Sequence, residues 1–244
     1  MEELFYLEGS ISVKAALECH SRPVSALIIE EKKSGRDLNY LLRLAEQEKI
    51  PVHRLPREKI DLLAEGTSHG GILAAVGARY TVELAQLLTA PSPFLVLLEG
   101  IEDPYNFGGA LRSLYAAGVT GIILPKRNWF SAAGIVAKAS AGASERMPVT
   151  TAGNFSETLS TVRKNGIPVI CALRKESATD LYATPLPRPL LLAVGGEMRG
   201  LSEKVAQQAD RNVYIPYGNE FRNAMSASAA CAIIAFEIFR QNRT

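Results

Sequence analysis

Two hydrophobic patterns alternate in the first part of the chain. Short apolar runs are typical of buried strands, and longer segments with leucines at helical spacing are typical of amphipathic helices. The predicted strands are 24–30, 50–55 and 70–77, and the predicted helices are 12–20, 36–49 and 57–65. This alternation predicts a small α/β module over residues 1–78.

A second series of strands and helices follows the proline-containing stretch "APSPF". Its predicted strands are 93–100, 121–125, 167–173, 189–197 and 212–217, and its predicted helices are 130–144, 202–209 and 225–242. Such β-then-α order predicts a mainly parallel sheet, with ligands bound at the carboxyl ends of the strands. We therefore expect a second α/β domain over residues 93–244, joined to the first by a linker over residues 79–92.

Composition removes several classes of protein from consideration. An apolar fraction of 47% and a charged fraction of 21% are ordinary for a folded domain. The cysteines Cys19, Cys171 and Cys231 are odd in number and widely spaced, and no histidine lies near a plausible set of ligands, so we expect no disulfide framework and no metal site. The acidic first residues lack a signal-peptide pattern, and no apolar run is long enough for a membrane span, so we expect a cytoplasmic protein.

Charge adds little to this picture. Residues 1–92 contain 11 Lys/Arg and 13 Asp/Glu, whereas residues 93–244 contain 16 and 12. The basic excess of the second part weakly favours a polyanionic partner. Ordinary scatter of surface charge explains it equally well.

Three segments break the strand and helix patterns, and each follows a predicted strand. They are "NFGGALRS" (Asn106–Ser113), "VGGEMRGL" (Val194–Leu201) and "YIPYGNEFRNAMSASAAC" (Tyr214–Cys231). Glycine weakens a helix interior by about 1 kcal/mol relative to alanine, so the paired glycines indicate that something approaches the backbone closely. Asn106 is a candidate N-cap for a helix that begins at Phe107. The spacing of a dinucleotide fingerprint and of a Walker P-loop is absent, which makes a nicotinamide enzyme improbable.

Together, the three segments resemble the motifs of the SpoU (TrmH-like) RNA 2′-O-ribose methyltransferase family of the SPOUT superfamily. Asn106 and Arg112 match the Asn-x₅-Arg pattern of the first motif. The residues that match the second and third motifs are Gly195, Glu197, Gly200 and Leu201, then Ile215, Pro216 and the helix start "AMSASAACAI". The resemblance covers residues 93–244 and implies a deep trefoil knot in that domain. The segments "LEGSISVKAALE" and "SHGGILAAV" look like the two ends of the ribosomal-protein-like substrate-binding domain that this family often carries.

The resemblance implies methyl transfer from S-adenosylmethionine to a ribose 2′-hydroxyl of structured RNA, either ribosomal or transfer RNA. The implied cofactor-binding residues are Gly195, Gly196, Gly200, Ile215, Pro216, Met225 and Ser228. The glycines would let the backbone approach the cofactor. Ile215 and Met225 would supply apolar walls and backbone hydrogen bonds to adenine.

The implied catalytic residues are Arg112, Asn106, Glu197 and Ser226. Arg112 would grip the phosphate beside the target ribose and orient the hydroxyl, and the alternative is a surface arginine paired with Glu102 or Asp103. Asn106 would cap and rigidify the helix that carries Arg112. Glu197 would hold Arg112, or the loop around it, by a salt bridge, or would complement the dipole of a helix N-terminus.

The third motif departs from the family pattern, because its Ser-Leu-Asn is Ala224-Met225-Ser226 here. Ser226 keeps a hydroxyl with shorter reach than asparagine, and Asn223 is the alternative. This departure leaves a catalytically silent RNA-binding relative open as an alternative function. The acidic first unit leaves open an α/β enzyme for a small molecule or nucleotide that is unrelated to RNA. The family implies a homodimer through the C-terminal domain, whereas the small residues of the last helix are equally explained by packing within one chain.

Overall fold

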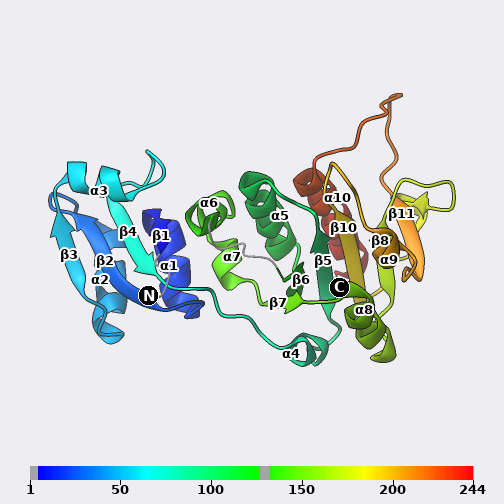
Figure 1. Cartoon of the computed structure of the whole chain (residues 1–244), viewed down its shortest axis with the longest axis horizontal. Coiled ribbons are helices and arrows are strands. Elements are labelled where there is room, and N and C mark those ends of the chain that lie inside the picture. The colour runs from blue at the N-terminus through cyan, green and yellow to red at the C-terminus, as the bar shows by residue number, and fades with distance from the viewer. Residues whose placement is uncertain (1–4, 127–131, 244) are drawn as a thin grey trace. The chain divides into compact units, whose positions relative to one another are not determined.

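The computed structural model describes residues 5–126 and 132–243. These residues form two compact units, one made of 5–80 and 132–146, the other of 81–126 and 147–243 (Figure 1). The chain thus leaves the first unit, returns to it for a short segment, and completes the second unit afterwards. The predicted functional division, with residues 79–92 as a linker, stays a prediction.

The first unit is a four-stranded sheet with helices. Its elements are β1 (Phe5–Glu8), α1 (Gly9–Cys19), β2 (Val24–Glu30), α2 (Arg36–Gln47), β3 (Val52–Leu55), α3 (Arg57–Leu63), β4 (Ile72–Val76), α6 (Ala133–Ala139) and α7 (Ala143–Arg146). The strand order is β1-β4-β2-β3, with β4 antiparallel to both neighbours and β2 parallel to β3. The three predicted strands and three predicted helices are confirmed, and β1 is an additional strand.

The small residues of the predicted helix 130–144 belong to the first unit. Phe130 and Ser131 lie outside the described residues, and the rest forms α6 and α7, separated where Ala141 and Gly142 have positive φ angles of 50° and 79°. A Cβ at Gly134 would come within 2.7 Å of the Tyr6 carbonyl oxygen in β1. Glycine and alanine therefore let α6 pack directly on the edge of this sheet.

The second unit is an α/β/α sandwich. Its elements are α4 (Leu84–Leu88), β5 (Phe94–Glu99), α5 (Pro104–Ala116), β6 (Gly121–Pro125), β7 (Val149–Ala152), α8 (Phe155–Lys164), β8 (Val169–Ala172), β9 (Thr179–Asp180), the 3₁₀ turn Leu181–Ala183, β10 (Leu190–Gly195), α9 (Glu203–Ala206), β11 (Arg211–Tyr214) and α10 (Ala227–Asn242). The strand order is β7-β6-β5-β10-β8-β11-β9, and every pairing is parallel, which confirms the predicted parallel sheet.

Helices cover both faces of this sheet. Alternate strand residues such as Leu95, Leu191 and Val169 share one buried core with residues of α4, α8 and α9. On the other face, α5 packs beside α10, and α10 packs on β10 (Figure 1). The helices α5 and α10 pack side by side at Gly109 and Ser228, where a Cβ on Gly109 would lie in ordinary contact, 3.5 Å from Cβ of Ser228. Small residues of the last helix therefore serve packing within the chain.

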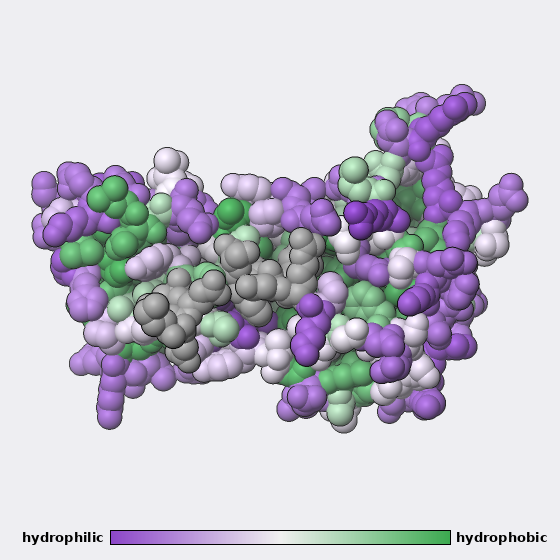
Figure 2. Space-filling view, viewed as in Figure 1, coloured by the Kyte–Doolittle hydropathy of each residue, from purple (hydrophilic) through white to green (hydrophobic). Residues whose placement is uncertain are grey.

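The loop between β11 and α10 extends away from the sheet, and its surface is largely hydrophilic (Figures 1 and 2). It starts at the carboxyl end of β11, where β10 and β8 also end, because all three strands are parallel. The three motifs singled out in the sequence therefore converge at this edge of the sheet.

The first helix of the motif region does not begin where the sequence suggested. Helix α5 begins at Pro104, and its N-cap is Asp103, whose carboxylate accepts a hydrogen bond from the Asn106 backbone N–H at 2.7 Å. Asn106 lies within the first turn, so its predicted role as N-cap is wrong. Proline at the first helical position and aspartate before it form an efficient helix start. The Asn106 side chain is thereby left for other contacts.

Candidate functional site

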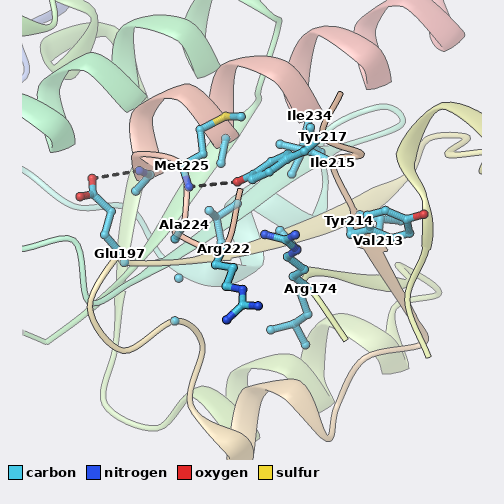
Figure 3. Close-up of a pocket in the computed structure, with 18 residues that line it drawn as sticks. Arg174, Glu197, Val213, Tyr214, Ile215, Tyr217, Arg222, Ala224, Met225 and Ile234 are labelled. Carbon is cyan, nitrogen blue, oxygen red and sulfur yellow. Dashed lines mark hydrogen bonds between the residues drawn. The ribbon is translucent and has the colours of Figure 1, made fainter. Parts of the chain in front are cut away.

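A cavity of about 420 Å³ opens at the carboxyl ends of β8, β10 and β11 (Figure 3). Its apolar walls come from Ala172, Leu173, Val213, Ile215 and Ile234. The remaining residues that line it are Arg174, Val194, Gly195, Gly196, Glu197, Gly200, Tyr214, Tyr217, Arg222, Ala224, Met225, Ala227 and Ala230. The volume and the mix of apolar walls with few polar groups are those of a small-molecule site.

A chain of hydrogen bonds joins the three motifs beside this cavity. Glu197 Oε1 accepts from Asn106 Nδ2 at 3.0 Å and from the backbone N–H of Ala227 at 3.2 Å. Ser228 Oγ donates to Asn106 Oδ1 at 3.2 Å and lies 3.1 Å from Ser226 Oγ. The predicted residues from segments far apart in sequence are thus brought together.

The network also shows what two of these residues do. Glu197 binds Asn106 and the N-terminus of α10, so the predicted salt bridge to Arg112 is wrong, and the predicted complement to a helix dipole fits instead. Ser226 is the N-cap of α10, and its hydroxyl accepts from the Ala229 backbone N–H at 3.2 Å. Asn223 is exposed and does not line the cavity. Ser226 is therefore the residue that takes part in the network.

The second motif is glycine-rich because the chain packs on itself there. A Cβ at Gly195 would overlap the backbone of Gly200 and Leu201, and one at Gly196 would overlap the carbonyl group of Gly100. The Gly196 N–H also donates to the Glu99 carbonyl at 2.7 Å. The close approach predicted for these glycines is real, and the group that approaches is the protein backbone itself. Gly200 is needed for its positive φ of 64°.

Replacing Gly196 with alanine is expected to destabilise the fold by about 1–3 kcal/mol, because the new Cβ would overlap Gly100 and force backbone shifts. Gly218→Ala is the matched control, since a Cβ at Gly218 would meet nothing within 4 Å. Urea unfolding of both variants measures the difference. Equal stability of the two variants would contradict this packing.

The third motif supplies an apolar wall and an unexpected tyrosine. Ile215 and Met225 line the cavity as predicted, but the Met225 backbone N–H donates to Tyr217 Oη at 3.1 Å (Figure 3). A ligand that uses this N–H must therefore compete with Tyr217. Pro216 and Ser228 do not line the cavity. Pro216 lines a neighbouring surface hollow, and Ser228 is part of the polar network beside the cavity.

Arg112 is exposed on α5 and does not line the cavity. Within the described residues it makes no hydrogen bond or ion pair, so the alternative pairing with Glu102 or Asp103 is absent. Its guanidinium is therefore available to a bound partner. Because α5 also carries Asn106, the helix that presents Arg112 is tied to Glu197 and to α10.

Sequence reasoning missed Arg174, Tyr217 and Arg222, which all line the cavity. The signal available for Arg174 was its place directly after the strand 167–173, at the edge where a parallel sheet binds ligands. Tyr217 and Arg222 lie in an irregular loop, where no periodic pattern assigns direction to a side chain. Only the folded loop shows that they face the cavity.

Three general properties of the described residues concern metal binding, membrane insertion and thiol chemistry. In 5–126 and 132–243 no group of three His, Cys, Asp or Glu side chains is placed to hold a metal ion. No helix of these ranges has the length and apolar character that crossing a bilayer requires. Burial raises the pKa of both the Cys171 and the Cys231 thiol to about 12, so neither is a reactive thiolate.

Comparison with known proteins identifies both parts of the chain. Residues 93–236 match the "SpoU rRNA Methylase family", and residues 6–81 match the domain described as "RNA 2′-O ribose methyltransferase substrate binding". A Staphylococcus saprophyticus relative, named for the TrmH family of tRNA/rRNA methyltransferases, is 32% identical over 246 residues that cover 99% of this chain and 97% of the relative. A Pseudomonas putida relative, named 23S rRNA (guanosine-2′-O-)-methyltransferase RlmB, is 29% identical over 248 residues, with 100% and 99% coverage.

Solved structures support the same fold. The AdoMet-bound rRNA methyltransferase from Sinorhizobium meliloti superposes with a TM-score of 0.84 at 20% identity, over 99% of this chain and 88% of that one. The SpoU methyltransferase AviRb from Streptomyces viridochromogenes gives 0.81 at 21% identity, over 98% and 89%. The predicted fold class is thus confirmed, with a parallel-sheet methyltransferase domain and an N-terminal α/β substrate-binding domain. The chain belongs to the SpoU rRNA methylase family.

Proposed function

We propose that this protein transfers a methyl group from S-adenosylmethionine to a ribose 2′-hydroxyl of structured RNA, ribosomal or transfer. One observation carries the proposal: the three motifs converge beside one cavity, where Glu197, Asn106, Ser226 and Ser228 form a single polar network. The family match over both units supports the same reaction class. The RNA substrate would be recognised in part by the first unit.

The residues of the cavity fit the cofactor. Its volume of about 420 Å³ and its apolar walls suit a nucleoside with a short side chain. Gly195, Gly196 and Gly200 would form a wall of backbone against which it lies, and Ile215 and Met225 would flank the adenine. Pro216 and Ser228 would support this shape from outside the cavity. When bound, S-adenosylmethionine supplies an electrophilic methyl group on a sulfonium.

The protein's task in such a reaction is mainly alignment. An in-line attack requires the ribose hydroxyl to be held close to the methyl carbon. Arg112 lies outside the cavity, where RNA can reach its guanidinium. This guanidinium would hold the phosphate next to the target ribose. Asn106 and Glu197 would hold α5 in position against the N-terminus of α10.

Two further features are part of the proposal. A deep trefoil knot in the second unit is supported by the position of β10, which lies between β5 and β8 in the sheet. The close packing of Gly196 on Gly100 fits such a tightly threaded loop. A cytoplasmic location fits three free cysteines and an RNA substrate.

The test is methyl transfer from tritiated S-adenosylmethionine to unmodified cellular RNA, with nucleoside analysis for 2′-O-methyl ribose. Calorimetry with S-adenosylmethionine is run beside it. We expect both cofactor binding and incorporation into ribose. Binding without transfer would indicate the silent RNA-binding relative, and absence of binding would leave the small-molecule enzyme.

We also propose a homodimer through the second unit. Phe236 and Phe239 are 45% and 39% exposed on α10, with ring centroids 6.2 Å apart. Exposed aromatic pairs of this kind mark interaction surfaces. Phe236→Glu is expected to convert the dimer to a monomer in light scattering at micromolar concentration. Leu62→Glu, at an 85% exposed leucine of the first unit, is the control and should stay dimeric.

A further inference from the structure

Two arginines that were not among the predicted site residues line the cavity. Arg174 follows β8 directly, and Arg222 lies in the loop between β11 and α10. In Figure 3 the Arg174 guanidinium lies beneath the ring of Tyr217, and the Arg222 side chain lies beside Arg174 with its guanidinium directed the other way. Two cationic side chains from separate segments therefore line the same cavity.

One set of contacts holds this arrangement. Arg174 Nη1 donates to the Phe221 carbonyl at 2.8 Å, and its guanidinium carbon lies 4.7 Å from the centroid of the Tyr217 ring. Tyr217 in turn accepts from the Met225 backbone N–H. Because Phe221 precedes Arg222 in the chain, the Arg174 bond fixes the backbone from which Arg222 projects. Arg174 keeps further N–H donors for another acceptor.

Among the described residues that line the cavity, no acidic side chain pairs with these two charges. Glu197 is the one Asp or Glu among the described residues lining the cavity, and its Oε1 is bound to Asn106 and Ala227. In Figure 3 its carboxylate is directed toward the N-terminus of α10, away from both arginines. Within the described ranges, Arg222 has no hydrogen-bond or ion-pair partner and Arg174 has no carboxylate partner. Two positive charges that line one cavity without a carboxylate partner favour an anion bound there.

We propose that Arg174 and Arg222 form an oxyanion-binding subsite of this cavity. Planar guanidinium groups bind carboxylates and phosphates through paired hydrogen bonds. The inference rests on the proposed function, which offers two oxyanions of this kind: the carboxylate of S-adenosylmethionine and a phosphate of the RNA. Arg222 binds the oxyanion with a guanidinium that makes no other hydrogen bond within the described residues. Arg174 binds the same oxyanion and also positions Arg222 through its bond to the Phe221 carbonyl.

The experiment compares Arg222→Ala and Arg222→Lys in the full-length chain, with Lys164→Ala as a control for loss of one positive charge. Lys164 is the last residue of α8 and precedes β8, so it lies at the amino ends of the parallel strands, away from the cavity. Calorimetry measures binding of S-adenosylmethionine and of methylthioadenosine, which lacks the carboxylate. If Arg222→Ala binds S-adenosylmethionine about tenfold more weakly than the wild type but binds methylthioadenosine equally well, the carboxylate is the bound oxyanion. Arg222→Lys should recover part of the loss, since it keeps the charge without the fork.

If the bound oxyanion is an RNA phosphate, the binding measurements give a different pattern. S-adenosylmethionine affinity would then be unchanged in Arg222→Ala, whereas binding to unmodified cellular RNA would weaken and the salt dependence of binding would fall by about one unit of slope. Inorganic phosphate serves as a probe independent of activity, because it should raise the unfolding temperature of the wild type more than that of Arg222→Ala. Equal behaviour of the two proteins in all three measurements would overturn the subsite. A phosphate effect without methyl transfer by the wild type would instead reject the proposed function alone.

Discussion

Replacing Arg112 with alanine is expected to slow methyl transfer to RNA by about two to three orders of magnitude and to leave S-adenosylmethionine affinity nearly unchanged. The reason is geometric: Arg112 lies outside the cavity and has no partner within the described residues, so its guanidinium is available to RNA. A group that acts on the substrate in the transition state lowers the chemical step when it is lost. Positioned electrostatic groups of this kind contribute about 3–4 kcal/mol.

Single-turnover transfer measures the chemical step, and calorimetry measures the cofactor affinity. Arg112→Lys should recover little activity, because an ammonium lacks the planar two-pronged grip on phosphate. Lys164→Ala, which removes a charge from the opposite edge of the sheet, should be fully active. Near wild-type transfer by Arg112→Ala would make this residue an ordinary surface charge. Loss of cofactor binding in the same variant would make it structural.

Much of the site was predictable because a parallel sheet brings the carboxyl ends of its strands to one edge. The order of strands and helices was readable from hydrophobic spacing, and the three irregular segments all followed strands. That is sufficient to place Asn106, Glu197 and Ser228 near one another without knowing their contacts. The structure adds the contacts themselves, through Asn106 Nδ2 to Glu197 and Ser228 Oγ to Asn106.

What the sequence could not supply depends on contacts between distant segments. The glycines at 195 and 196 correctly indicated a close approach, but a single sequence does not distinguish a ligand from the backbone of Gly100 or Gly200. The cap of α5 is Asp103 rather than Asn106, because Pro104 starts the helix earlier than the apolar pattern does. Arg222 lies in a loop without periodicity, so its direction is set by Arg174 and Phe221.

The segment 132–146 illustrates a second limit. Its small residues predict a closely packed helix, but periodicity does not indicate which sheet the helix packs against. In the structure Ala133 and Ala137 join the core of the first unit, with Leu7 and Val13. The segment therefore belongs to the first unit, although the described residues before and after it in sequence belong to the second. A buried ion pair between Glu145 and Arg22 also attaches it to the first unit.

Removing one partner of that ion pair is expected to destabilise the first unit by about 3–5 kcal/mol. Glu145 accepts from Arg22 Nε at 2.8 Å and Arg22 Nη2 at 2.9 Å, and also from Ser21 Oγ at 2.6 Å. The side chains of Arg22 and Glu145 are only 3% and 1% exposed. Glu145→Ala would leave the guanidinium buried without its carboxylate, which is the costly case.

Urea unfolding followed by circular dichroism measures the loss of stability, and amide hydrogen exchange locates it. We expect exchange to increase in α6 and α7 (Ala143–Arg146) more than in α10, because Glu145 lies in α7. Lys14→Met is the matched control, since the side chains of the Lys14–Glu18 pair are 49% and 23% exposed with 3.7 Å between the charged atoms, and the pair should contribute less than about 1 kcal/mol. If both variants lose the same free energy of unfolding, burial does not increase the contribution of the Arg22–Glu145 pair to stability.

The same pair predicts a pH dependence. Burial alone raises the pKa of Glu145, but the charge of Arg22 and the hydrogen bonds from Arg22 and Ser21 outweigh it, so the pKa lies below its usual value. A carboxyl with a lowered folded-state pKa contributes stability that is full above its unfolded pKa of about 4.3 and is lost as pH falls through the folded value. The stability difference between the wild type and Glu145→Gln should therefore be largest near neutral pH and shrink below about pH 4. A difference that stays constant down to about pH 3 would mean that Glu145 contributes through its shape and hydrogen bonds rather than through its charge.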